Sequence, residues 1–285
     1  MIEVTGHREG DRAAGSADCA GLDETTPQVF LVARPSLDLD GMRGYLETVG
    51  GESWLDRRVG EAADGRAPNP AETLIEFAGR LCYRSWEPGL NPNVSRIRTD
   101  QREYFENILR SAHGSVLEHA SYSFALRNCS RVFTHELVRH RAGSAFSQES
   151  LRYVRLTDIG FRVPPALEPV RDQVVSIVEQ LEEFQRSAAG ELGIDEEGLP
   201  FHVKKEITSA LRRLAPIGLS TDILWTANVR TLRHVIEMRT AEGAEEELRL
   251  VFDRIASIMV AEAPNLFQDF RRMDDGSWVP EYRKV

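Results

Sequence analysis

An arginine-rich stretch near the middle of the chain limits what this protein can be. Six arginines lie between residues 127 and 155, against only Glu136 and Glu149, although the 285-residue chain carries a formal net charge of -10. A local concentration of positive charge in an acidic protein predicts a site for an anionic ligand. Any single arginine is better explained by a surface carboxylate or a helix C-terminus. The cluster as a whole favours a binding site.

The same stretch predicts a helix followed by a loop. Ser130 can cap the helix and Gly143 can end it, which leaves Arg139, His140 and Arg141 in its last turn. Consecutive helical side chains point about 100° apart, so these three can share one site only where several ligand groups meet. Segment 142–150 is small and hydroxyl-rich, and we expect a loop that binds phosphate oxygens. The apolar face of the helix is predicted to contain Val132, Phe133, Leu137 and Val138.

Length and composition predict one soluble domain at residues 27–285, preceded by a polar, flexible extension at 1–26. Residues 51–71 are charged and contain glycine and proline, which indicates an insertion loop. The chain contains neither a signal peptide nor an apolar run of about 18 residues, so we expect a cytoplasmic protein without a membrane partner. A pI near 5.3 argues against nucleic acid as a partner.

Hydrophobic periodicity predicts the remaining elements. Strands are expected at 29–34 and, from strict alternation, at 120–126. Helices are expected at 71–82, 99–112, 174–192 and 203–214, with a proline-rich loop at 164–169. A later helix is expected to carry a core stripe made of Leu248, Val251, Phe252, Ile255, Ile258 and Met259.

Other catalytic signatures are incomplete or missing from the sequence. His135 and His140 are five positions apart, about 140° around a helix, which is too far for one zinc ion, so His135 is expected to pack or hydrogen-bond. The sequence has no glycine-rich dinucleotide motif, phosphate-binding P-loop or serine-hydrolase elbow. Cys82 and Cys129 lie in apolar contexts and are expected in the core, which leaves no obvious cysteine nucleophile.

The run RHRAGSAFSQESLRY (139–153) resembles the signature of the flavin-dependent thymidylate synthases. The run HGSVLEH (113–119) is similar to a second segment of that family, and the resemblance extends over residues 75–265. It implies an α/β fold of the α+β type, with a small, mainly antiparallel sheet flanked by helices and assembled as a homotetramer. It also implies FAD, NADPH and methylenetetrahydrofolate in the methylation of dUMP at carbon 5.

The resemblance assigns roles to individual residues. Arg239 matches an arginine at the uracil edge, where a fixed cation stabilises negative charge on the ring. His113 matches a histidine near the flavin ring and the folate, so both residues are candidates for catalysis. Nucleotide contacts are assigned to Glu136, Arg139, Gln148, Glu149, Ser150, Arg152, Arg212 and Arg239. Flavin contacts are assigned to Ser115, Glu118, Arg139, His140, Arg141, Asn228, Arg230 and His234.

The sequence departs from the family pattern at four places. Glu136 replaces a glutamine, Gln148 takes the place of a glutamate, Gly243 replaces a histidine, and the spacer 142–149 has eight residues where the family has seven. A carboxylate at Glu136 can accept hydrogen bonds from ribose hydroxyls, so we hypothesise that UMP is a substrate as well as, or instead of, dUMP. Two alternatives remain open: a flavin- or nucleotide-binding module without catalysis, and a zinc hydrolase.

Overall fold

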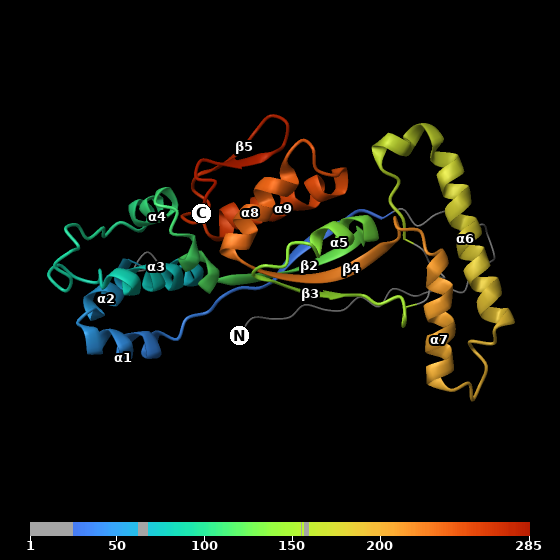
Figure 1. The fold of residues 1–285 in the computed structure, drawn as a ribbon, viewed down its shortest axis with the longest axis horizontal. Coiled ribbons are helices and arrows are strands. Elements are labelled where there is room, and N and C mark those ends of the chain that lie inside the picture. The colour runs from blue at the N-terminus through green and yellow to red at the C-terminus, as the bar shows by residue number, and fades with distance from the viewer. Residues whose placement is uncertain (1–24, 62–67, 155, 157–159) are drawn as a thin grey trace, which may run out of the picture.

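A four-stranded antiparallel sheet lies in the middle of the molecule (Figure 1). The computed structural model describes residues 25–61, 68–154, 156 and 160–285. The strands lie in the order β1–β2–β4–β3, and their flanking helices give the predicted mixed fold with a small antiparallel sheet. The bounds are Gln28–Ala33 for β1, Ser121–Ser130 for β2, Ser144–Gln148 for β3 and Ser220–Asn228 for β4.

Strand β2 is central, because it pairs with both β1 and β4. Its side chains alternate as predicted: Tyr122, Phe124 and Leu126 are buried, whereas Ser121 is exposed. Phe124 lies opposite Trp225 of β4 in the ladder, and both side chains are fully buried. The alternation therefore fixes which face of the sheet is turned towards the core.

Three helices cover that face: α5 (Arg131–Leu137), α8 (Val229–Thr240) and α9 (Glu246–Glu262) (Figure 1). In the predicted core stripe of α9 only Ile258 is partly exposed, so this prediction is confirmed. Helices α5 and α8 each begin directly where a strand of the sheet ends. The sheet thus fixes the start of α5, after which Arg139, His140 and Arg141 follow, and the start of α8, which carries Arg230 and His234.

No helix in the described part of the chain covers the opposite face of the sheet (Figure 1). On that face, Phe30 is 49% exposed, Val32 55% and Leu224 40%. Phe30 lies opposite Ala125, which in turn lies opposite Leu224, so these side chains form one row across three strands. The single chain therefore leaves an apolar strip of its sheet in contact with solvent.

Four helices lie at one end of the molecule (Figure 1). Their bounds are Leu39–Val49 for α1, Glu52–Glu61 for α2, Pro70–Tyr83 for α3 and Gln101–Arg110 for α4. Helices α3 and α4 confirm the predictions at 71–82 and 99–112. Cys82, however, is exposed near the end of α3, so its predicted place in the core is wrong, while Cys129 is buried as expected.

The prediction of an insertion loop at 51–71 is wrong for most of the described residues. Helix α2 occupies 52–61, and its Trp54 and Leu55 are buried together with Leu46 and Trp86. Arg58 is also buried, because it pairs with Glu76 at 2.8 Å. One of the charges that suggested a loop therefore belongs to an ion pair inside the protein. Residues 62–67 lie outside the described residues.

The predicted extension at 1–26 falls almost entirely outside the described residues. Of its last two residues, Thr25 is buried, which contradicts a flexible segment there. Its hydroxyl hydrogen-bonds the hydroxyl of Ser220, and its N–H donates to the carbonyl of Phe161. These two bonds attach the chain to the first residue of β4 and to Phe161 shortly before β1 begins.

A pair of helices, α6 (Arg171–Glu191) and α7 (Phe201–Leu211), forms the other end of the molecule (Figure 1). A short 3-10 helix (Pro165–Val170) replaces most of the predicted proline-rich loop. None of the described helices is long and apolar enough to cross a membrane. Two short strands, β5 (Phe270–Arg272) and β6 (Trp278–Pro280), complete the fold.

Candidate active site

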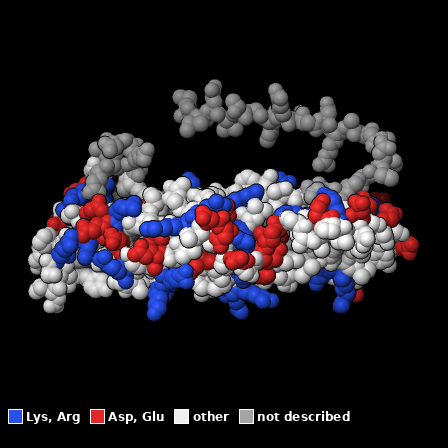
Figure 2. Space-filling view, turned by 90° about the horizontal axis from the view of Figure 1, so that it is seen from above, with Lys and Arg blue, Asp and Glu red and all other residues white. Residues whose placement is uncertain are grey.

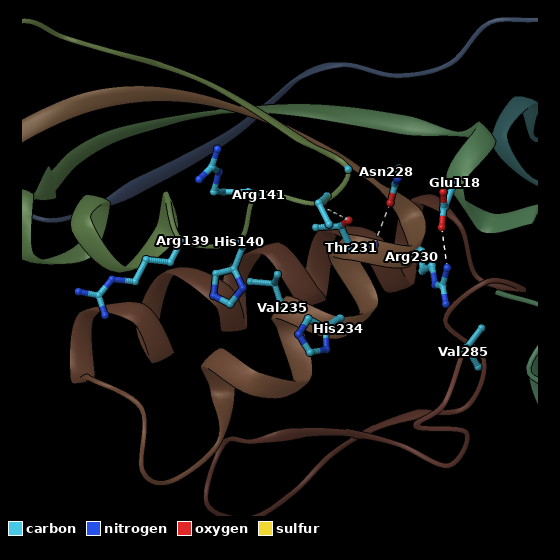
Figure 3. A pocket seen from close by; sticks show the side chains of 12 residues that line it. Glu118, Arg139, His140, Arg141, Asn228, Arg230, Thr231, His234, Val235 and Val285 are labelled. Atoms are coloured by element: carbon cyan, nitrogen blue, oxygen red, sulfur yellow. Dashed lines mark hydrogen bonds and ion pairs between the residues drawn. The ribbon is translucent and has the colours of Figure 1, made fainter. Parts of the chain in front are cut away.

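Helix α5 is shorter than predicted. Ser130 caps it by accepting a hydrogen bond from the Phe133 N–H at 3.1 Å, as expected. The helix ends at Leu137, so Arg139, His140 and Arg141 lie in the turn that follows it and not in its last turn. Freed from helical geometry, the three side chains point in different directions (Figure 3).

The predicted loop after Arg141 is largely a strand. Residues Ser144–Gln148 form β3, which pairs with β4 from Ala227 to Ile223. Its bonds to β4 use backbone groups that the prediction assigned to phosphate binding. What remains of the predicted loop is the turn at 142–143 and the segment after Gln148.

Gly143 is required by the tight turn between α5 and β3. Its φ of +65° lies in the left-handed region, and a Cβ atom there would meet the Asn228 side chain and lie 2.5 Å from Thr231 Oγ1. The Gly143 carbonyl accepts from the Asn228 N–H at 3.0 Å, and Thr231 Oγ1 donates to the Ala142 carbonyl at 2.7 Å. These bonds hold the Arg-His-Arg segment against the start of α8.

A cavity of about 590 Å³ opens between this segment and α8 (Figure 3). Seven of the eight residues predicted to contact a flavin line it, and Ser115 does not. Thr231, Val235 and Val285 also line the cavity, and no motif in the sequence marked these three. The seven predicted residues are Glu118, Arg139, His140, Arg141, Asn228, Arg230 and His234.

His140 links this cavity to Arg239. Nε2 of His140 accepts a hydrogen bond from Arg239 Nε at 2.8 Å, and NH1 of Arg239 contacts Glu136 Oε2 at 2.6 Å. Burial and the charges of Arg239 and His234 lower the pKa of His140 to about 4, against the opposing effect of Glu136. His140 is therefore neutral at pH 7 and carries its proton on Nδ1.

The far end of the cavity is held by an ion pair and a helix cap. Arg230 lies 2.6 Å from Glu118, as the dashed line in Figure 3 shows. Asn228 caps α8 by accepting from the Thr231 N–H at 2.9 Å. Asn228 thus has a structural role in addition to its place in the wall of the cavity.

The donors of the cavity fit a flavin dinucleotide. Arg139 and Arg141 are exposed cations without an ion-pair partner among the described residues, and both line the cavity, as does the amide of Asn228. Guanidinium groups bind phosphate through a planar fork, and a pyrophosphate offers the oxygens for it. The rings of His140 and His234, with centroids 6.3 Å apart, add flat surfaces that suit an aromatic ligand.

Further predicted site residues lie towards the other end of α5. Gln148 donates to Thr134 of α5 at 3.1 Å, and the Glu149 carbonyl accepts from Arg131 at 3.0 Å. The Ser150 hydroxyl accepts from the N–H of Arg152 at 3.3 Å. The seven residues of α5 therefore connect this group with Glu136 and Arg239.

His113 and Ser115 lie outside the cavity wall. His113 stacks edge-on against Tyr83, and its buried Nδ1 has no hydrogen-bond partner among the described residues. Ser115 is exposed in a short 3-10 helix (Gly114–His119) that also carries Glu118. His135, expected to pack or hydrogen-bond, is instead exposed on α5.

Figure 2 shows how charge is distributed on the side that carries α8 and α9. Lysine and arginine are interspersed with aspartate and glutamate over this surface and do not gather into one basic area. Arg139 and Arg141, which have no ion-pair partner among the described residues, therefore form a local concentration of positive charge at the cavity. This arrangement suits a small anionic ligand better than an extended one.

Comparison with known proteins adds independent findings. The family model described as thymidylate synthase complementing protein matches residues 66–265. A flavin-dependent thymidylate synthase of Mycolicibacterium gilvum is 37% identical over 225 residues, which cover 76% of this chain and 85% of the relative. Enzymes of the same name from Mycobacteroides abscessus (37% over 203 residues; 69% and 78%) and Mycobacterium marinum (36% over 215 residues; 73% and 84%) are also similar.

Proposed function

Because the chain belongs to the thymidylate synthase complementing protein family, which is the family of the flavin-dependent thymidylate synthases, we propose that it methylates carbon 5 of a uridine nucleotide. The observation that carries this proposal is the cavity lined by Arg139, His140 and Arg141, with Arg239 bonded to one of its walls. A flavin site and a fixed cation for the uracil then lie side by side. Residues 27–285 form the catalytic domain in this proposal.

The proposed reaction is a reductive methylation. Methylenetetrahydrofolate donates the one-carbon unit, which replaces the proton on carbon 5, and two electrons from NADPH complete its reduction to a methyl group. When bound, FAD supplies the redox chemistry of this transfer. Arg139, Arg141, Asn228 and Arg230 would hold it.

Arg239 has the central electrostatic role. A guanidinium remains charged at every pH of interest, so it stabilises negative charge on the uracil without a proton transfer. Stabilised charge makes carbon 5 nucleophilic, and no cysteine needs to attack the ring. His113 would lie near the folate in this proposal, and its buried Nδ1 has no hydrogen-bond partner among the described residues.

The nucleotide is held by the residues at both ends of α5. Ser150, Arg152 and Arg212 provide donors for the phosphate, and Arg139 adds a further cation, while Gln148 and Glu149 support the loop that carries Ser150. Glu136 selects the sugar in this proposal, since its carboxylate can accept from a ribose hydroxyl. UMP is then a substrate in addition to, or in place of, dUMP.

The site is completed by other copies of the chain, which we propose assemble as a homotetramer. Two features of the single chain support this assembly. One is the apolar strip of Phe30, Val32 and Leu224 on the open face of the sheet, and the other is the pair α6 and α7, where Ile177 and Phe201 are 59% and 67% exposed. Surfaces of this kind are typical of interfaces between subunits.

The test begins with the purified protein. A yellow preparation, or one that takes up added FAD, followed by conversion of dUMP or UMP to the 5-methyl product in the presence of NADPH and methylenetetrahydrofolate, supports the proposal. A protein that binds flavin and nucleotide but turns over neither substrate would instead be a binding module. A colourless protein that takes up no FAD would refute both.

A further inference from the structure

A second cavity, of about 210 Å³, lies between α3, α4 and the loop 84–100 that joins them. Its charged lining consists of Arg80, Arg96 and Arg98, and no aspartate or glutamate of the described residues lines it. In a chain with a net charge of -10, three arginines around one cavity indicate a site for an anion. This cavity shares no lining residue with the one proposed for the flavin, so the two are separate.

A buried arginine holds the loop in this shape. Arg80 is 1% exposed and donates to the Ser85 carbonyl at 2.6 Å and to the Arg98 carbonyl, near the two ends of the loop. Its own charge is paired with Glu76 at 2.8 Å. The contact at Arg98 uses the main chain of that residue. The side chain of Arg98 is therefore not needed to hold the loop closed.

The side chains of Arg96 and Arg98 share one carboxylate. Glu103 lies 2.5 Å from Arg96 and 3.5 Å from Arg98, which is the more buried of the two arginines. One carboxylate cannot balance two guanidinium groups, so this group of three keeps a net positive charge beside the cavity. Both arginines would attract a further anion to it.

The cavity adjoins His113 at two points. The exposed ring of Tyr83 lines the cavity and stacks edge-on against His113, with ring centroids 5.6 Å apart. The N–H of His113 donates at 3.1 Å to the carbonyl of Ile108, which is another lining residue. In the proposed function His113 lies near the folate. A folate bound there has this cavity as its neighbour.

We propose that the cavity binds the glutamate carboxylates of methylenetetrahydrofolate. The inference rests on the proposed function for the identity of the folate, to which it adds a subsite. Folates carry their glutamates at the end remote from the donated carbon, and each further glutamate adds one carboxylate. Arg96 and Arg98 bind these carboxylates through charge-assisted, planar pairs. Tyr83 offers a flat surface to the p-aminobenzoyl ring that separates the glutamates from the pterin.

A structural role is the alternative, in which the two arginines only pair with Glu103. The two roles predict opposite effects for Glu103→Gln. This variant removes the carboxylate that competes for both arginines, so a folate tail should bind more tightly, whereas a structural pair would only be lost. The cap of α4 is kept, because it uses the N–H of Glu103 and the side chain of Asp100. Arg98→Gln removes one cation and keeps the carbonyl that Arg80 binds.

Calorimetry of folic acid and of its triglutamate with the flavin-loaded protein measures the subsite without turnover. We expect the wild type to bind the triglutamate about 5- to 20-fold more tightly, as for one or two charge-assisted contacts. Arg98→Gln should reduce this preference to about 2-fold or less, and Glu103→Gln should increase it about 2- to 5-fold.

Arg110→Gln is the matched control. Arg110 is an exposed arginine of α4 that pairs with Glu106 at 3.4 Å and does not line the cavity. Its replacement removes the same charge from the same helix and should leave the preference for the triglutamate unchanged. A parallel titration with NADP⁺ distinguishes the folate carboxylates from the phosphates of the dinucleotide.

Several results would overturn the inference and leave the proposed function intact. These are equal binding of folic acid and its triglutamate by the wild type, an unchanged preference in Arg98→Gln, or a loss in Arg98→Gln that affects NADP⁺ and not the triglutamate. Should Arg98→Gln fail to fold, Glu103→Gln carries the test, and weaker binding of the triglutamate by this variant counts against the subsite. A wild-type protein that methylates neither uridine nucleotide would overturn the proposed function as well.

Discussion

Arg239 and Glu136 form an ion pair of 2.6 Å between α8 and α5. The carboxylate of Glu136 therefore contacts the guanidinium that the proposed reaction assigns to the uracil edge. A nucleotide that uses Arg239 must therefore compete with Glu136 or share the guanidinium with it. Since Arg239 also donates to His140, any change at this pair reaches the wall of the cavity proposed to bind the flavin.

Replacement of Arg239 should stop the chemistry without emptying the flavin site. Arg239→Gln removes the fixed charge, and we expect kcat to fall about 100- to 1000-fold, as for the loss of a donor to a charged transition state. Arg239 does not line the flavin cavity, so the flavin absorbance band should persist. Turnover and the visible spectrum, measured on one preparation, check this expectation. Full activity of the variant would exclude the electrostatic role.

Glu136→Gln should change the choice of sugar. If the carboxylate accepts from a ribose hydroxyl, the variant loses activity on UMP while its activity on dUMP is kept or improved. The ratio of kcat/KM for the two nucleotides, compared between variant and wild type, measures the effect. Equal rejection of UMP by both proteins would end the hypothesis that this residue selects the sugar.

The low pKa of His140 makes the stability of the fold dependent on pH. Its pKa is about 4 in the folded chain, against an ordinary value of 6.5, so between these values the unfolded chain binds more protons. The free energy of unfolding should therefore fall as the pH is lowered from 6.5 towards 4. Urea titrations at pH 7 and pH 5 should show a smaller loss in His140→Gln. An identical loss in both proteins would contradict this origin.

Gly143→Ala should destabilise the protein by about 1–3 kcal/mol, because the residue needs a left-handed backbone and the added Cβ overlaps Asn228 and Thr231. Flavin affinity should fall as well, since the turn holds the Arg-His-Arg segment. Gly190→Ala is the control: it lies inside α6 with open space around it, and alanine should stabilise it by about 0.5–1 kcal/mol. Thermal melts and FAD titrations compare the two.

Glu76 should be among the most sensitive positions for stability. Its buried carboxylate accepts from Trp54, Arg58, Arg80 and Gln101 at 2.8–3.0 Å. Glu76→Gln removes the buried negative charge with which Arg58 and Arg80 pair, and we expect a loss of about 3–5 kcal/mol.

The exposed pair between Glu106 and Arg110 provides the comparison for Glu76. Its nitrogen and oxygen atoms are 3.4 Å apart, and Glu106→Gln should change stability by less than about 0.5 kcal/mol. Denaturant unfolding of both variants tests the contrast. Similar losses in the two proteins would mean that the buried network adds little.

The sequence predicted those helices and strands whose hydrophobic pattern depends only on the burial of one face of a single segment. The alternation along β2 and the apolar stripe of α9 are read directly from sequence, because each follows from burial on one side. The cap at Ser130 is equally local, and so was found. The cluster of Arg139, His140 and Arg141 was recognised from its charge and from the family motif.

Features that depend on distant partners escaped prediction. The sequence of α2 resembles a charged loop, because the partner that allows Arg58 to be buried, Glu76, belongs to α3. The sequence of β3 resembles a hydroxyl-rich loop, because the backbone hydrogen bonds that make it a strand come from β4. The environment of Arg131 depends on the Glu149 carbonyl, which accepts from one of its terminal nitrogens, and on the charge of Arg212, and its own segment reveals neither.

The brevity of α5 limits how relatives of this chain can vary in length. Each residue added to or removed from a helix rotates everything after it by about 100°, so an insertion between Arg131 and Glu136 would turn one of them away from its partner. In β3 a single inserted residue would reverse which side chains face Thr134. Insertions and deletions should therefore concentrate after Gln148, where the chain leaves β3, and be rare within α5 and β3.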